Sequence, residues 1–165
     1  MDLRRVFRHL IAPDWLVYRA FPRATLTRIE AAIRQSEAAH RGELRFAVEP
    51  GLDLLPLLRG LTPRQRALDV FSRLRTWDTE ENSGVLIYVQ LVDRDIEIVA
   101  DRGIGAKVGQ EQWDAICHRM EEAFRDRRFE AGALEGIAEI TKLLTAHFPA
   151  RRDNPDELPD RPVVL

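Results

Sequence analysis

The feature that most restricts the fold is a nearly unbroken apolar run, VLIYVQLV at residues 85–92, which begins directly after Gly84. A run of this length between turn residues is typical of a strand that is covered on both faces. The polar turn Asp93–Asp95 follows, and IEIVA at residues 96–100 predicts a second strand antiparallel to the first. The apolar run is therefore expected at the centre of a sheet.

Patterns on either side of this hairpin predict a small α/β layer structure. Alternation in residues 44–48 predicts a half-buried strand, and a capping box at Thr62 and Gln65, with Pro63 between them, predicts a helix before the apolar run. A strand, helix, strand connection favours a parallel pair, so the sheet should be mixed. Further helices are predicted over residues 3–11, 27–40, 110–124 and 134–148.

The chain of 165 residues has the length of one globular domain. We expect an N-terminal amphipathic helical segment at residues 1–23 and an α/β domain at residues 24–149. Residues 150–165 contain three prolines among mixed charges and show no periodicity, so they predict a disordered tail.

Composition excludes several classes of protein. Lys and Arg number 25 against 27 Asp and Glu, so binding to nucleic acid through bulk positive charge is not expected. The single cysteine, Cys117, excludes an internal disulfide and lies on an apolar stripe, which predicts a buried, inert thiol. No apolar run is long enough to span a bilayer and no signal peptide is visible, so a cytoplasmic location is expected.

The N-terminal segment has an excess of arginine and an apolar stripe. Met1–Ala12 could therefore contact a membrane surface or a membrane-protein partner, with peripheral attachment of the protein. The alternative is a helix that packs on the domain with its arginines solvated.

Several motifs resemble catalytic sites only in part. Asp93 and Asp95 follow a strand, as in dehalogenase-type phosphatases, but Glu97 stands where Thr or Val is expected, so a hairpin turn is favoured. The glycines at 103, 105 and 109 imitate a dinucleotide loop, but turn glycines explain them better. The histidines His9, His40 and His147 are predicted at helix ends or on solvated faces.

Acidic residues gather at one end of the predicted hairpin. Asp78, Glu80 and Asn82 precede its first strand, and Asp101 follows the second, so all four can converge at one edge of the sheet. Such oxygen ligands suit a hard cation such as calcium or magnesium. The alternative is a solvated acidic loop in which Asp101 pairs with Arg75 or Arg102.

The residues Trp77–Thr79, then Asn82–Gly84 leading into the hairpin and the glycine loop, and later Phe129–Gly132, resemble the TPM domain family of thylakoid lumen phosphatase-like domains. The resemblance covers about residues 27–149 and identifies a divergent, bacterial-type member. It implies a three-layer α/β/α sandwich around a small mixed sheet, here with an extra N-terminal helix. Members are described as binding calcium, as weak acid phosphatases, or as accessory parts of membrane complexes.

These observations lead to two functional hypotheses. The first is a non-catalytic or weakly catalytic accessory module of a membrane-associated system, with Ca²⁺, in preference to Mg²⁺, at Asp78, Glu80, Asn82 and Asp101. The second is a metal-dependent acid phosphatase acting on phosphate esters, in which a metal-bound water attacks because no side-chain nucleophile with a matching base is visible. The sequence assigns no catalytic residue.

Overall fold

The computed structural model describes residues 3–52, 57, 60–151 and 157–165, with side chains from residue 7 onward. Its centre is a four-stranded sheet with the strand order β3-β2-β1-β4. β1 pairs parallel with β2 and β4, whereas β2 and β3 pair antiparallel, so the predicted mixed sheet is confirmed. The strands are β1 (Leu44–Glu49), β2 (Val85–Gln90), β3 (Asp95–Ala100) and β4 (Val163–Val164).

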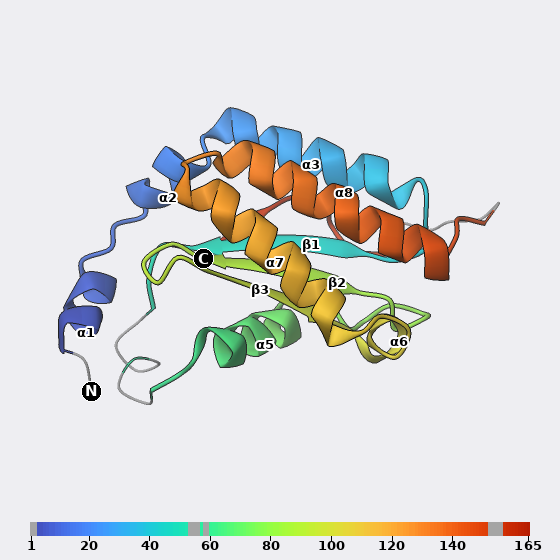
Figure 1. Cartoon of the computed structure of the whole chain (residues 1–165), viewed down its shortest axis with the longest axis horizontal. Coiled ribbons are helices and arrows are strands. Elements are labelled where there is room, and N and C mark those ends of the chain that lie inside the picture. The colour runs from blue at the N-terminus through green and yellow to red at the C-terminus, as the bar shows by residue number, and fades with distance from the viewer. Residues whose placement is uncertain (1–2, 53–56, 58–59, 152–156) are drawn as a thin grey trace.

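Helices lie on both faces of the sheet, as Figure 1 shows, and this confirms the three-layer α/β/α sandwich. α3, α7 and α8 cover one face, and α5 covers the other. α1 and α2 lie beyond one end of the sheet. In chain order the helices are α1 (Leu3–Leu10), α2 (Trp15–Ala20), α3 (Arg23–Glu37), α5 (Pro63–Arg73), α6 (Arg102–Gly105), α7 (Gln110–Arg125) and α8 (Phe129–His147).

The helix starts show where local signals succeed and where they mislead. The capping box at Thr62 and Gln65 is present at the start of α5, as predicted. α3 begins at Arg23, however, and not at Thr27. The Thr27 hydroxyl donates to the carbonyl of Arg23, 3.0 Å away, as it can in the interior of a helix. A Thr followed by Glu three residues later therefore did not mark this helix start. α2 was not predicted.

β1 corrects the prediction of a half-buried strand, because all six of its residues are buried. Its polar side chains face α5 and the C-terminal segment, and they are paired there. Glu49 accepts hydrogen bonds from Arg66 of α5, at 2.6 and 3.0 Å, and from the Tyr88 hydroxyl, at 2.5 Å. Arg45 donates to the carbonyl of Pro159. Alternation in the sequence showed which face is apolar but not that the polar face is covered.

The C-terminal segment corrects the prediction of a disordered tail at residues 150–165. Residues 152–156 lie outside the described part, but β4 pairs with β1 through Ala47 and Val48. The carboxylate of Glu43 accepts the backbone N–H groups of Glu157 and Leu158, at 3.2 and 3.1 Å. The Arg34 guanidinium donates to Asp160, 3.0 Å away. These bonds use backbone groups and distant charges, which leave no periodic pattern in the sequence.

The buried ion pair gives the first prediction, for Arg66→Met. This change leaves the Glu49 carboxylate buried without its cation, so we expect a loss of about 3–5 kcal/mol in the free energy of unfolding. Urea denaturation measures this loss. Arg73→Met, on the exposed face of the same helix, is the control and should change the free energy by less than about 0.5 kcal/mol. A stability of Arg66→Met within about 1 kcal/mol of the original protein would contradict the role of the pair.

Glu37 gives a prediction about pH. Burial raises the pKa of its carboxyl to about 9, against the opposing hydrogen bond from the Leu44 N–H, and nearby Asp160 and Glu43 add to the rise. Because the folded pKa lies above the unfolded one, Glu37 contributes stability that is present at low pH and lost as pH rises toward 9. We expect the melting temperature to fall between pH 6 and pH 9, and Glu37→Gln to flatten that fall. An equal fall in both proteins would show that Glu37 does not titrate in this range.

Candidate functional site

The acidic loop lies between α5 and β2 and contacts the start of α6. Asn82 has a left-handed backbone (φ 54°), and its carbonyl accepts the N–H of Gly103 at 2.9 Å and of Ile104 at 3.3 Å. A Cβ on Gly103 would stand 2.3 Å from the carbonyl oxygen of Glu81, so only glycine fits this contact. The glycine after β3 is thus explained by the close approach of two loops.

The structure brings together two of the four predicted ligands. Asn82 accepts a hydrogen bond from the Arg102 guanidinium at 2.8 Å, and Asp101 caps α6 by accepting the backbone N–H of Arg102 at 2.7 Å. Asp78 is exposed and pairs instead with Arg75, 2.7 Å away. Glu80 is also exposed, and its backbone N–H donates to the Glu157 carboxylate. Arginine side chains therefore already bind side-chain oxygens of Asp78 and Asn82 that were predicted to bind a metal ion.

The buried carboxylate oxygens that have no hydrogen-bond partner among the described residues include Oδ2 of Asp101 and Oε2 of Glu81, both at this end of the sheet. The other Glu81 oxygen pairs with Arg41. A buried oxygen without a partner requires an explanation, and a hard cation would supply one. Within the described ranges, however, no three His, Cys, Asp or Glu side chains are placed to hold a metal ion. The calcium site therefore stays a prediction, with its best support at Asp101.

His9 lies in the last turn of α1 and His40 just after α3, so the prediction of helix ends fits, but both rings are buried and not solvated. His40 accepts a hydrogen bond from Ser36 and donates to the Gly42 carbonyl, and burial lowers the pKa of its ring to about 4. His9 is 3% exposed, and its Nδ1 accepts the backbone N–H of Leu52 at 2.9 Å. Its Nε2 then carries the proton and lies 3.1 Å from the Asp93 carboxylate. The His40 ring thus bonds to residues near it in the sequence, whereas the partners of His9 are distant and no local sequence pattern shows them.

Cys117 is half-buried on α7. Burial raises the pKa of its thiol to about 12. The thiol therefore stays protonated at neutral pH, in agreement with the prediction of an inert cysteine.

The first two helices carry most of the exposed large apolar side chains of the described residues. Trp15 and Tyr18 of α2 belong to this set, as do residues in and next to the end of α1. We call the five together the N-terminal apolar face: Phe7 (63% exposed), Leu10 (51%), Ile11 (58%), Trp15 (55%) and Tyr18 (45%). Only Leu68 and Trp77 are comparably exposed in the rest of the described chain.

Comparison with known proteins identifies the family. The sequence profile of the TPM domain matches residues 19–143. The chain belongs to the TPM domain family. All residues of the N-terminal apolar face come before the matched range in the sequence of this TPM domain protein. Among the described residues, no helix has both the length and the apolar character needed to cross a membrane.

Solved structures resemble this TPM domain protein over most of its length. The BA42 protein of the psychrophilic bacterium Bizionia argentinensis is 31% identical, with a TM-score of 0.72, over 86% of this chain and 92% of that one. The N-terminal domain of a P. gingivalis protein is 16% identical, with a TM-score of 0.61, over 90% and 99%. The N-terminal domain of cg2496 from Corynebacterium glutamicum shares the fold. It is 11% identical, with a TM-score of 0.55, over 82% of this chain and 80% of that one. No curated protein matches the sequence.

The unpaired oxygen of Asp101 gives a prediction for calcium. If a cation binds there, millimolar CaCl₂ should raise the melting temperature of the original protein, because a ligand that binds only the folded state stabilises it. Asp101→Asn keeps a good N-cap but removes the charge, so it should lose the shift. Asp78→Asn, in the exposed part of the loop, should keep it. A shift of equal size in Asp101→Asn would contradict this placement.

Proposed function

We propose that this TPM domain protein is a non-catalytic accessory module that attaches to an anionic membrane surface through the N-terminal apolar face. The observation that carries the proposal is the exposure of this face on α1 and α2. Several large apolar side chains exposed on two successive helices of a folded domain are typical of interaction sites. Aromatic and aliphatic side chains on a short basic helix are what a membrane interface accepts.

The orientation of α1 supports this proposal. A helix that packs on its own domain normally turns its apolar stripe inward. Here the polar residue His9 faces inward and bonds to Leu52 and Asp93, while Phe7, Leu10 and Ile11 face outward. The domain thus holds α1 by a buried histidine and leaves Phe7 and Leu10 of this helix exposed for another surface.

Charge and residue type favour a lipid surface over a protein partner. Exposed Arg8 lies on α1, and exposed Arg19 lies on α2 together with Trp15 and Tyr18. Trp and Tyr are enriched where a membrane meets water, and each arginine near an anionic surface adds about 1 kcal/mol of attraction. A membrane-protein partner remains as an outcome of the test below.

A second candidate is the metal-dependent phosphatase, and one observation favours it: the buried, unpaired Oδ2 of Asp101. A divalent cation bound there would acidify a water molecule and polarise a phosphate ester. Asp101 would hold the cation, and Asn82, beside it, would add an amide oxygen only if Arg102 releases it. Hydrolysis of p-nitrophenyl phosphate that needs calcium or magnesium and disappears in Asp101→Asn would support this candidate.

Co-sedimentation with vesicles tests the membrane proposal. The protein should pellet with phosphatidylglycerol-containing vesicles and much less with pure phosphatidylcholine. Ile11→Ser/Trp15→Ser should reduce the bound fraction at least fivefold, and 0.5 M NaCl should weaken binding because salt screens the arginines.

Leu68→Ser/Trp77→Ser is the matched control, because it removes the comparably exposed apolar side chains of the described residues outside α1 and α2. Its binding should equal that of the original protein. Equal loss in both double variants, or no binding to anionic vesicles at all, would overturn the proposal. In the second case the apolar face would be left for a membrane-protein partner.

A further inference from the structure

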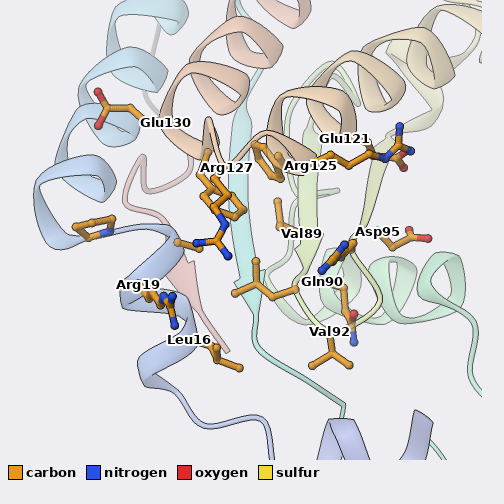
Figure 2. Close-up of a pocket in the computed structure, with 16 residues that line it drawn as sticks. Leu16, Arg19, Val89, Gln90, Val92, Asp95, Glu121, Arg125, Arg127 and Glu130 are labelled. Atoms are coloured by element: carbon orange, nitrogen blue, oxygen red, sulfur yellow. The ribbon is translucent and has the colours of Figure 1, made fainter. Parts of the chain in front are cut away.

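A pocket of about 570 Å³ lies at the end of the sheet opposite the acidic loop. β2 starts at the acidic loop and ends in the pocket, so the two places are separated by the length of that strand. α2, the β2–β3 turn and the connection from α7 to α8 form its walls, as Figure 2 shows. Its volume is in the range of small-molecule sites, roughly 300–1,000 Å³.

Part of the pocket wall is apolar and firmly packed. Leu16, Val89, Phe124 and Phe129 line it. The rings of Phe124 and Phe129 lie 5.2 Å apart between centroids, and each also contacts the ring of Phe21 in the core. Because this aromatic cluster fixes the wall, an apolar ligand group would meet a preformed surface.

The rest of the wall has an excess of unpaired positive charge. Arg19, Arg94 and Arg127 line the pocket, and among the described residues their side chains have no ion-pair or hydrogen-bond partner. Of the carboxylates that line the pocket, Glu121 pairs with Arg125, at 3.4 Å, and Glu130 is bound by Thr25 and Arg28. Figure 2 shows Glu130 and Asp95 turned away from the space between Arg19 and Val89.

Two of these arginines occupy backbone positions that disfavour them. Arg94 and Arg127 have left-handed backbones, with φ of 56° and 59°. Glycine or asparagine adopts this conformation at lower cost. Both positions are in turns, in separate parts of the chain, and both side chains line the same pocket. Two unfavourable turn residues that converge on one space indicate that the guanidinium groups themselves matter there.

We propose that this pocket binds a single-chain amphipathic anion. Its carboxylate or phosphate head group would pair with Arg19, Arg94 and Arg127, because a guanidinium matches either oxyanion with two hydrogen bonds. Its alkyl chain would lie on Leu16 and the Phe124–Phe129 wall. Such a ligand can come from solution as a monomer or from a bilayer, and binding of the monomer does not require attachment of the N-terminal apolar face to a membrane.

Titration of the ¹⁵N-labelled protein with dodecyl phosphate, below the concentration at which it forms micelles, tests the pocket. We expect the amide signals of residues 89–95 and 127–130 to shift with saturation. Arg94→Gly/Arg127→Gly should weaken binding at least tenfold without unfolding the domain, because glycine suits both backbones. The neutral dodecyl maltoside and inorganic phosphate alone should each bind at least tenfold more weakly than dodecyl phosphate.

Arg75→Gly is the matched control, since Arg75 also has a left-handed backbone (φ 54°) but lies by the acidic loop. It should bind dodecyl phosphate like the original protein. Equal affinity of the original protein and Arg94→Gly/Arg127→Gly, or shifts outside the pocket residues, would overturn the proposal. Vesicle binding that Ile11→Ser/Trp15→Ser abolishes, without any binding of the monomer, would overturn the pocket while leaving the membrane proposal intact. If the same pocket signals shift with phosphatidylcholine vesicles that contain single-chain lysophosphatidylglycerol, and not with pure phosphatidylcholine vesicles, a bilayer can be the source of the ligand.

Discussion

The buried ion pair between Arg66 and Glu49 joins the α5 layer of the sandwich to the central sheet. Glu49 lies on β1, in the middle of the sheet, and Arg66 reaches it from the helix layer on the α5 side. Hydrogen bonds to Glu49 raise the pKa of Arg66, and burial raises the pKa of the Tyr88 hydroxyl, so the network is a cation and a carboxylate with a protonated phenol. With both faces of the sheet covered, each polar side chain on β1 needs such a partner.

Much of the fold could be predicted from the sequence, because the central elements have strong local signals. The apolar run of β2, the turn at Asp93 and the capping box at Thr62 each identified an element and its neighbours. The predictions that were wrong concerned segments whose structure depends on partners distant in the sequence. β1 looked half-buried because Arg45 and Glu49 are polar, and the C-terminal segment looked disordered because Glu43 binds its backbone from the other end of the chain.

The candidate sites could be predicted less well than the fold. The sequence indicated that Asn82 and Asp101 meet at one edge of the sheet, since hairpin topology alone brings their positions together. It also offered the alternative of an acidic loop paired by Arg75 or Arg102, and both arginines do bind there, although Arg75 pairs with Asp78 rather than Asp101. The pocket arginines Arg19, Arg94 and Arg127 were missed altogether, because they come from three separate segments and each looks like an ordinary solvated residue. Only the packing of α2 against the two turns puts them together.

The short strand β4 protects one edge of the sheet from pairing with other chains. β4 covers β1 through two residue pairs, and the clasp formed by Glu43, Arg34 and Arg45 holds it there. Without this segment, the N–H and C=O groups along one side of β1 would form an open sheet edge, and such edges pair with other chains. β4 therefore keeps the edge of β1 from pairing with another chain. Loss of β4 would therefore leave the domain with an edge that can template self-association.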